Sequence, residues 1–200
     1  MSIDGTLAVV TYHAIDYRPS VTSLSPELFR WQMDALAARG FAGISLAQAF
    51  DHLQRTGSYP SNAVVLTFDD GYRSVLEHAL PVMAVHGFSA TAFLVTSLVG
   101  MSTAQAKAVH PEFDRDLLTW SQAEAWVRSG CEIGSHTLNH PDLTRLSRDA
   151  LEEELGQSRE ILEQRLQTRV DALAYPYGYF NAAVITAAAR HYRRACTTRL

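Results

Sequence analysis

Short apolar runs alternate with amphipathic segments along almost the whole of this 200-residue sequence. The clearest run, Ala63–Phe68 (AVVLTF), has the length and the β-branched composition of a strand that is buried on both faces. Buried parallel strands are joined by crossover helices, and helix-like segments follow most of the apolar runs. The alternation therefore predicts an α/β fold, either a (β/α) barrel or an open doubly wound sheet.

The same periodicities predict the other elements. We expect a buried strand at residues 7–12 and a helix over residues 25–40, with Ser25 as N-cap, Pro26 in the first turn and Gly40 at its end. The polar stretch 97–117 is predicted to be a surface loop. Further strands are expected at residues 41–46, 88–95, 131–135, 170–175 and 194–197, and further helices at residues 47–54, 74–85, 121–129, 147–166 and 181–191.

Composition limits the classes of function. Hydrophobic residues make up 47% and charged residues 19%, as expected for one folded domain spanning residues 1–200. A net charge of −4 without a long basic run argues against nucleic-acid binding. No apolar run approaches the roughly 18 residues of a membrane span, and the N-terminus lacks the basic segment of a signal peptide. We expect a soluble, cytoplasmic chain, although an exported form whose signal had been removed would show the same pattern.

Two adjacent carboxylates, Asp69 and Asp70, directly follow the strand at Ala63–Phe68. In parallel α/β folds, polar residues at the carboxyl ends of strands line the ligand-binding mouth. Buried carboxylates are costly unless a cation or a donor network satisfies them, so one Asp could bind a metal ion while the other faces a water. Taken alone, the pair is equally consistent with an ordinary Asp-Gly turn at a helix N-terminus.

Two histidines, His136 and His140, follow the predicted strand at residues 131–135. A spacing of four lets both imidazoles reach one metal ion from a compact loop, while Glu132 is expected to point away from them. Two unrelated loop histidines are the alternative for this cluster alone. Combined with one of the Asp residues, the histidines form an N,N,O ligand set, and the second Asp is then placed to act as a general base on a bound water.

A third polar cluster, Ala174-Tyr175-Pro176-Tyr177-Gly178, follows the predicted strand at residues 170–175. The proline fixes the exit of the strand, and the glycine permits close approach of the backbone. Such a turn could present the backbone N–H of Tyr177 to a developing oxyanion. Alone, the cluster is also consistent with a plain aromatic-rich turn.

In this order, the three clusters resemble the motifs of the polysaccharide deacetylase family, also called carbohydrate esterase family 4. TFDDGY is similar to the first motif, SHTLNHP to the second and AYPYG to the end of the third. The early Tyr12-His13 pair and the helix after it resemble the branch that deacetylates exopolysaccharides such as poly-N-acetylglucosamine. The resemblance implies a distorted, partly open (β/α) barrel whose C-terminal elements could be missing here, and metal-dependent removal of N-acetyl groups from N-acetylglucosamine-containing polysaccharide or oligosaccharide.

The resemblance also implies roles for single residues. Asp70, His136 and His140 would bind a divalent metal ion, which is Zn²⁺ or alternatively Co²⁺, Ni²⁺ or Mn²⁺. Asp69 would be the base for a metal-bound water that attacks the acetyl carbonyl, and the amide of Tyr177 would stabilise the oxyanion. Thr137 would brace the second-motif loop, and Pro176 is expected to contact substrate. Independently of the resemblance, aromatic side chains near the predicted mouth, Tyr72 and Tyr179 among them, could stack on sugar faces, although packing in the core is the commoner role of such residues.

Three features depart from the family pattern. Ala174 stands where many members have an arginine that orients the base, the fourth motif is not recognisable after Tyr177, and the fifth motif with its general-acid histidine would lie beyond Leu200. His13, at the mouth end of the first predicted strand, is the best substitute acid, although a structural role is equally consistent with its position. The alternatives that stay open are an O-acetyl esterase or small-amide hydrolase on the same scaffold, and a non-catalytic carbohydrate-binding relative.

Overall fold

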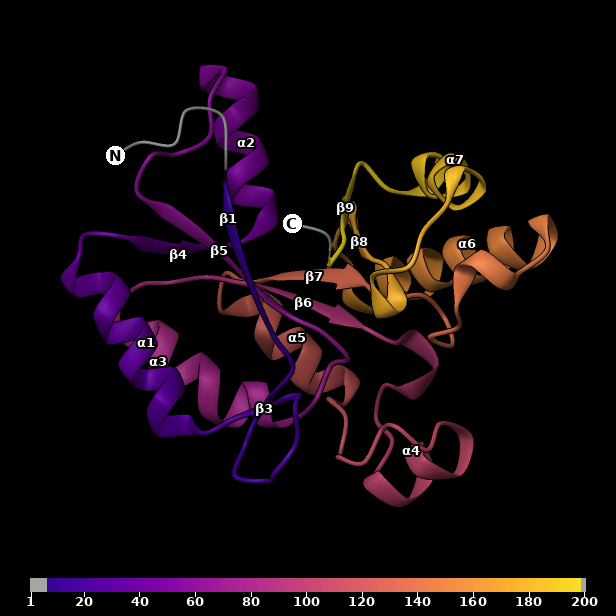
Figure 1. The fold of residues 1–200 in the computed structure, drawn as a ribbon, viewed down its shortest axis with the longest axis horizontal. Coiled ribbons are helices and arrows are strands. Elements are labelled where there is room, and N and C mark those ends of the chain that lie inside the picture. The colour runs from indigo at the N-terminus through magenta and orange to yellow at the C-terminus, as the bar shows by residue number, and fades with distance from the viewer. Residues whose placement is uncertain (1–6, 199–200) are drawn as a thin grey trace.

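The computed structural model describes residues 7–198, whose main sheet curls into a half-barrel (Figure 1). Seven parallel strands form this sheet in the order β1-β5-β6-β7-β8-β9, and β4 pairs with the first residues of β5. The bounds of the strands are β1 Ala8–Tyr12, β4 Ala42–Ile44, β5 Ala63–Phe68, β6 Thr91–Leu94, β7 Glu132–Ser135, β8 Ala172–Ala174 and β9 Arg194–Cys196. Two short strands, β2 (Ala14–Ile15) and β3 (Ser23–Leu24), pair separately. The predicted α/β class and partly open barrel are confirmed.

Helices surround the curled strands, with α1, α3, α5, α6 and α7 on the outside (Figure 1). The bounds are α1 Pro26–Ala38, α2 Leu46–Thr56, α3 Leu80–Val85, α4 Thr103–Val109, α5 Trp120–Arg128, α6 Arg148–Leu166 and α7 Ala182–His191. The Ser25 side chain accepts a hydrogen bond from the Leu28 N–H and caps α1, as its sequence predicts. Among residues 7–198, no helix combines the length and the apolar character that crossing a membrane requires.

The two faces of the sheet bury different side chains, because successive residues of a strand point to opposite sides. On β5, Val64, Leu66 and Phe68 face outward and pack under the helices. Val65 faces inward and packs with Phe93 and with side chains of α2, including Leu46. The interior of the half-barrel is therefore a filled core rather than a channel.

The same alternation points the functional side chains inward. Thr67 faces inward on β5 and donates from its hydroxyl to Thr11 of β1 at 2.9 Å, so Asp69, two positions after Thr67, continues on the inner face. The Cβ position of Gly134 on β7 faces inward, because a Cβ there would lie 2.4 Å from the inward-facing Phe93 ring. His136 follows two positions later and therefore points to the same side. The strand period alone thus aims both clusters at one cavity.

Strand β1 is exposed, whereas we expected it to be buried. The side chains of Val9 and Val10 are 45% and 39% exposed. The physical reason is the sheet order, since within residues 7–198 β1 pairs with β5 alone and forms one edge of the half-barrel. An apolar β-branched run predicts a strand correctly but does not reveal whether the strand lies at an edge.

Three further expectations need correction. The segment expected to be one helix at residues 74–85 begins as a π-helical turn at Val75–Ala79, next to Pro81, which cannot donate a backbone hydrogen bond. The stretch 97–117 is not all loop, because it contains α4, whose start is fixed by a capping box between Ser102 and Gln105. Glu132 shares the inner face of β7 with His136 but lies at the opposite end of the barrel, where it accepts hydrogen bonds from the hydroxyl of Thr91 and the N–H of Ala47.

Candidate active site and metal centre

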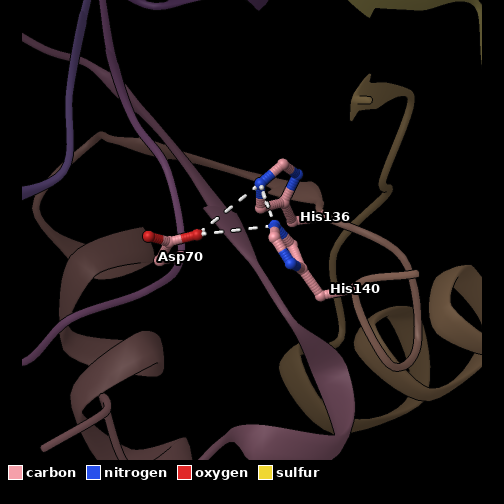
Figure 2. A group of neighbouring side chains, drawn as sticks. All are labelled: Asp70, His136 and His140. Carbon is pink, nitrogen blue, oxygen red and sulfur yellow. Dashed lines mark hydrogen bonds and ion pairs between the residues drawn. The ribbon is translucent and has the colours of Figure 1, made fainter. Parts of the chain in front are cut away.

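Asp70, His136 and His140 meet at the carboxyl ends of β5 and β7 (Figure 2). Oδ1 of Asp70 lies 3.7 Å from Nε2 of His136 and 3.8 Å from Nε2 of His140, and the two Nε2 atoms are 3.2 Å apart. The three side chains are between 4% and 10% exposed. Two loops distant in the sequence therefore place one carboxylate oxygen and two ring nitrogens around a single point.

The hydrogen bonds of the rings define which nitrogens face that point. Nδ1 of His136 lies 2.8 Å from the carbonyl oxygen of Ala174, and Nδ1 of His140 lies 3.1 Å from Oε1 of Glu112. Both partners are acceptors, so each Nδ1 carries the proton and donates it. In the neutral rings each Nε2 then presents a lone pair, and the two lone pairs face one another across 3.2 Å.

Facing lone pairs need a shared cation or a proton between them. Burial lowers the pKa of His136 to about 4, and the positive charge of His140 opposes its protonation further. Burial likewise lowers the pKa of His140 to about 4, with His110 and His13 adding to the shift. Because protons bind weakly here near neutral pH, and because an N,N,O donor set suits Zn²⁺ and similar ions, these residues could hold a divalent metal ion.

Asp69 lies beside this group and differs from Asp70 in its hydrogen bonding. Its Oδ1 is buried and has no hydrogen-bond partner among the described residues. Burial raises the pKa of Asp69 well above its ordinary value, and the charge of Asp70 raises it further. The carboxylate lines a cavity of about 350 Å³ together with His136 and His140. A buried acceptor left without a donor is an expected feature of a site that binds a ligand or a reacting water.

Backbone strain concentrates at the same place. Five non-glycine residues of the described chain have a positive φ, and four of them belong to the three motifs: Asp70 (72°), Thr137 (68°), His140 (58°) and Tyr177 (59°). A left-handed conformation is unfavourable for such residues, most of all for a β-branched threonine. Strain of this kind persists where the surrounding structure enforces it, which is typical of ligand and catalytic sites.

Hydrogen bonds hold the strained histidine loop in place. The Thr137 hydroxyl accepts from the backbone N–H of His140 at 3.0 Å, within the loop that it was expected to brace. Glu154 of α6 accepts from the N–H groups of Leu138 and Asn139 at 3.0 and 2.9 Å. Beneath the loop, the hydroxyl of Ser158 lies 2.7 Å from the hydroxyl of Ser135 at the end of β7. The loop is thus tied to α6 along its length.

The third cluster forms a 3₁₀ turn, Pro176–Gly178, next to the histidine loop. The Tyr177 side chain is 45% exposed, and its ring centroid lies 4.7 Å from that of His140. Its hydroxyl donates to Oε1 of Glu112 at 2.6 Å. The turn's own backbone hydrogen bonds are donated by Gly178 and Tyr179, to Tyr175 and Pro176 respectively. Tyr177 therefore lies against a ligand candidate and lines the cavity.

The remaining predicted residues differ in their exposure and in whether they line the cavity. His13 lines the cavity, and burial followed by the charge of Arg115 lowers its pKa. Tyr179 is 55% exposed, with its ring 5.8 Å from that of Tyr177. Pro176 is buried inside its turn. Tyr72 also lines the cavity, but it is only 3% exposed and Arg115 lies over its ring at 5.4 Å.

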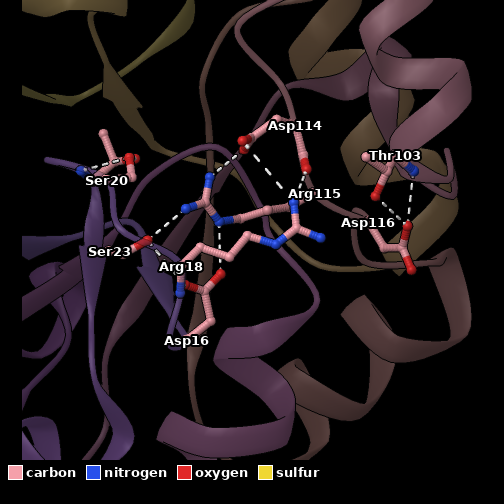
Figure 3. A network of polar contacts seen from close by, with 9 residues as sticks. Asp16, Arg18, Ser20, Ser23, Thr103, Asp114, Arg115 and Asp116 are labelled. Carbon is pink, nitrogen blue, oxygen red and sulfur yellow. Dashed lines mark hydrogen bonds and ion pairs between the residues drawn. The ribbon is translucent and has the colours of Figure 1, made fainter.

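Sequence reasoning missed three residues that line or support the cavity. Glu112 contacts both His140 and Tyr177, and Cys196 lines the cavity, where burial and the charge of Asp69 raise its pKa to about 12. Arg115 is buried, and its Nε donates to Asp16 at 2.7 Å (Figure 3). The available signal was weak: Glu112 and Arg115 lie in a polar stretch without periodicity, where nothing marks either as a site residue.

Comparison with known proteins gives consistent results. The polysaccharide deacetylase family model matches residues 56–195. YxkH of Bacillus subtilis, whose name places it with the polysaccharide deacetylases, is 25% identical over 96% of this chain and 64% of its own length. A poly-β-1,6-N-acetyl-D-glucosamine N-deacetylase of Staphylococcus aureus is 23% identical over 80% of this chain and 55% of its own. The chain therefore spans less than two thirds of these relatives.

Solved structures match the fold over nearly the whole chain. The deacetylase PplD of Streptococcus pyogenes, solved with acetate, superposes with a TM-score of 0.84 at 27% identity, covering 99% of this chain and 85% of PplD. IcaB of Ammonifex degensii gives a TM-score of 0.84 at 25% identity, covering 98% of this chain and 84% of IcaB. With the family model matching most of the sequence and the three motifs meeting at one cavity, the chain belongs to the polysaccharide deacetylase family.

Proposed function

We propose that this protein is a metal-dependent hydrolase that removes N-acetyl groups from polysaccharides or oligosaccharides containing N-acetylglucosamine. One observation carries the proposal: the unpartnered Oδ1 of Asp69 lies next to Asp70 and two imidazoles whose lone pairs face each other. An acceptor without a donor beside a set of metal ligands is the arrangement that amide hydrolysis by an activated water needs.

The ligands and the base have separate roles. Asp70, His136 and His140 would hold the divalent metal ion, which would supply Lewis-acid chemistry by making water more acidic and polarising the acetyl carbonyl. Asp69 accepts the proton of the attacking water at its free Oδ1.

Two further residues serve the carbonyl and the leaving group. The backbone N–H of Tyr177 donates to the oxygen that becomes negative as the tetrahedral intermediate forms. His13, on the β1 side of the cavity, gives a proton to the sugar nitrogen as the carbon–nitrogen bond breaks. Acetate and a free amine then leave.

The substrate class follows from the relatives and from the rim of the cavity. The Staphylococcus aureus relative is named as acting on poly-β-1,6-N-acetylglucosamine. Tyr177 lines the cavity and the Tyr179 ring lies next to it, and both are about half exposed and offer aromatic faces on which a sugar ring can pack. A glycan bound across these rings can place an acetyl group in the cavity.

The test measures acetate and amine together. The purified chain is stripped with a chelator, reloaded separately with Zn²⁺, Co²⁺, Ni²⁺ and Mn²⁺, and incubated with β-1,6- and β-1,4-linked N-acetylglucosamine oligomers. We expect no product from the stripped protein, and acetate and free amine in equal amounts after reloading. His140→Ala is expected to lose metal content and activity together.

Three results would overturn the proposal. Acetate release without amine from O-acetylated sugars, with no action on N-acetyl groups, would identify an esterase. Full activity in the stripped protein, or no activity with any ion and any of these substrates, would exclude metal-dependent N-deacetylation. A complete lack of activity with every ion and substrate would favour a carbohydrate-binding relative.

A further inference from the structure

A single carboxylate oxygen links two of the motifs. Oε1 of Glu112 accepts a hydrogen bond from the Tyr177 hydroxyl at 2.6 Å and from Nδ1 of His140 at 3.1 Å. These partners lie 65 and 28 residues away in the sequence. Glu112 is therefore the point at which the loop after β6, the histidine loop and the turn after β8 meet.

The chain on either side of Glu112 is anchored. The Phe113 ring is fully buried and stands perpendicular to the His140 ring, with centroids 5.2 Å apart. Two residues further on, buried Arg115 donates to Asp16, and next to it Asp116 accepts from both the N–H and the hydroxyl of Thr103 at 2.7 Å (Figure 3). The backbone next to Glu112 is thus anchored, whereas its side chain is 47% exposed and is held by its hydrogen bonds with His140 and Tyr177.

The contact with His140 affects the ligand atom on the opposite side of the ring. A carboxylate that accepts from Nδ1–H fixes the tautomer and the orientation of an imidazole, and it increases the basicity of Nε2. Here Nε2 of His140 is the atom that faces Asp70 and His136. Since Glu112 lies beyond the far side of the ring, it acts on the metal through His140 rather than as a ligand.

The contact with Tyr177 acts on the turn. Tyr177 has a left-handed backbone (φ 59°) and a half-exposed side chain, so packing alone holds it weakly. The phenol bond to Glu112 and the ring contact with His140 fix the side chain on one side of the cavity. Fixing the side chain also limits how the backbone N–H of this residue can turn.

We propose that Glu112 is a positioning residue that couples the metal ligand His140 to the oxyanion turn at Tyr177. The proposal rests on the proposed function, in which His140 binds the metal and the Tyr177 amide stabilises the oxyanion. Glu112 thereby makes tight metal binding and a correctly placed amide donor depend on one another.

The first test measures metal affinity and requires no substrate. Zn²⁺ dissociation constants are determined by competition with a chromophoric chelator for the wild type, Glu112→Ala, Glu112→Gln and His140→Ala. We expect Glu112→Ala to bind Zn²⁺ roughly 10- to 100-fold more weakly, as for other residues that support a metal ligand. Glu112→Gln, whose amide oxygen still accepts both hydrogen bonds, is expected to lose less. Glu160→Ala, at an exposed glutamate of α6 that pairs within its own helix, is the matched control and should bind like the wild type.

The second test measures turnover at saturating metal. Tyr177→Phe keeps the ring and the backbone but removes the phenol, so it should lower kcat without the loss of metal affinity seen in Glu112→Ala. The double variant Glu112→Ala/Tyr177→Phe should turn over no more slowly than Glu112→Ala, because both changes break the same hydrogen bond between Glu112 and Tyr177. Circular dichroism of each variant reports whether it is folded, and Glu112→Gln keeps the test valid if Glu112→Ala is not.

Three outcomes would overturn the proposal. The first is wild-type Zn²⁺ affinity in both Glu112 variants. The second is a loss in Glu112→Gln as large as in His140→Ala, which would make Glu112 a ligand. The third is an additive effect of Glu112→Ala and Tyr177→Phe on kcat. If the wild type fails to deacetylate any substrate, the proposed function fails, while the affinity measurements still report on Glu112.

Discussion

Both ends of the half-barrel contain buried carboxylates, and the two ends treat them differently. At the amino-terminal end of the strands, Glu132 accepts from the Thr91 hydroxyl at 2.7 Å and the Ala47 N–H at 2.8 Å, and it lies 3.6 Å from Arg194. At the carboxyl-terminal end, Asp69 has a buried oxygen without a donor. Burial raises the pKa of both groups, but only Glu132 has hydrogen bonds that lower it in turn.

The difference separates what supports the fold from what serves the site. A buried polar group that is fully paired stabilises one arrangement of the chain, whereas an unpaired one is costly and persists where function requires it. At the amino-terminal end, the Glu132 carboxylate has the first character, although Nη1 of the neighbouring Arg194 is buried without a hydrogen-bond partner among the described residues. The carboxyl-terminal end, with strained loops and facing lone pairs, has the second.

The largest expected effect comes from Asp69→Asn. Removing the base should lower turnover by roughly two to four orders of magnitude while leaving metal content unchanged. The unfolding free energy of the metal-free protein should stay the same or rise, since Oδ1 of Asp69 is buried without a hydrogen-bond donor among the described residues. Acetate release, metal analysis and thermal unfolding check this prediction. Near-normal turnover or a clear loss of stability would show that Asp69 stabilises the fold as Glu132 does, rather than serving the reaction.

The histidines of the site predict a pH dependence for the metal-free protein. Burial lowers the pKa of His136 and His140 to about 4, whereas in the unfolded chain both titrate near 6.5. Between these values the unfolded state binds more protons, so the stability that the neutral histidines contribute is fully present above pH 6.5 and is lost as the pH falls towards 4.

The measurement compares wild type with the double variant His136→Gln/His140→Gln in the presence of a chelator. The raised pKa values of Asp69 and Asp70 act in the opposite direction in both proteins. Removing His136, whose charge lowers the pKa of Asp70, strengthens this opposing contribution in the variant and so adds to the expected difference. The difference in unfolding free energy, wild type minus variant, should therefore decrease as the pH falls from about 6.5 to about 4. A difference that does not change with pH would contradict the prediction.

Glu132→Ala tests the other end of the barrel and should have the opposite profile to Asp69→Asn. It leaves the Ala47 N–H and the Thr91 hydroxyl without their acceptor, so we expect a loss of about 1–3 kcal/mol in unfolding free energy. Metal affinity and turnover should be retained at a temperature where the variant is folded. A selective loss of metal binding would show that the two ends are coupled.

The smallest effect is expected at the exposed edge strand. Val10→Thr on β1 should change the unfolding free energy by less than about 0.5 kcal/mol, because the side chain is 39% exposed. Val65→Thr, inside the half-barrel on the neighbouring strand β5, should cost about 1–3 kcal/mol, because it buries a hydroxyl. Chemical denaturation of the pair checks this, and equal losses would mean that β1 is covered in solution.

Patterns of short range allowed most elements to be predicted. Strand β5 follows from its uninterrupted composition, and the start of α1 follows from Ser25 and Pro26. The three motifs lie at strand ends, and the strand period together with the parallel order turns them towards one another. For that reason the two histidines could be grouped with one of the paired Asp residues from the sequence, and the resemblance to the family singled out Asp70, which lies with His136 and His140 in the structure.

Contacts between distant segments could not be predicted in the same way. The exposure of β1 depends on the order of strands in the sheet, which an apolar run does not encode. Arg115 pairs with Asp16 across 99 residues, and Glu112 with His140 across 28. Such pairs leave no periodic trace in a single sequence, because each residue alone looks like an ordinary surface charge.

The left-handed conformation of Thr137, His140 and Tyr177 bears on attempts to engineer a more heat-resistant form of this protein. The left-handed conformation of each such residue costs roughly 1–3 kcal/mol. A glycine at any of the three positions would relieve this strain, and a screen that measures only survival of heating would select it. The loops so relaxed would give up the side chains and the rigidity on which the reaction relies. Selection for thermal stability alone would therefore enrich stable but inactive variants, and a useful screen has to measure catalytic activity in the same round.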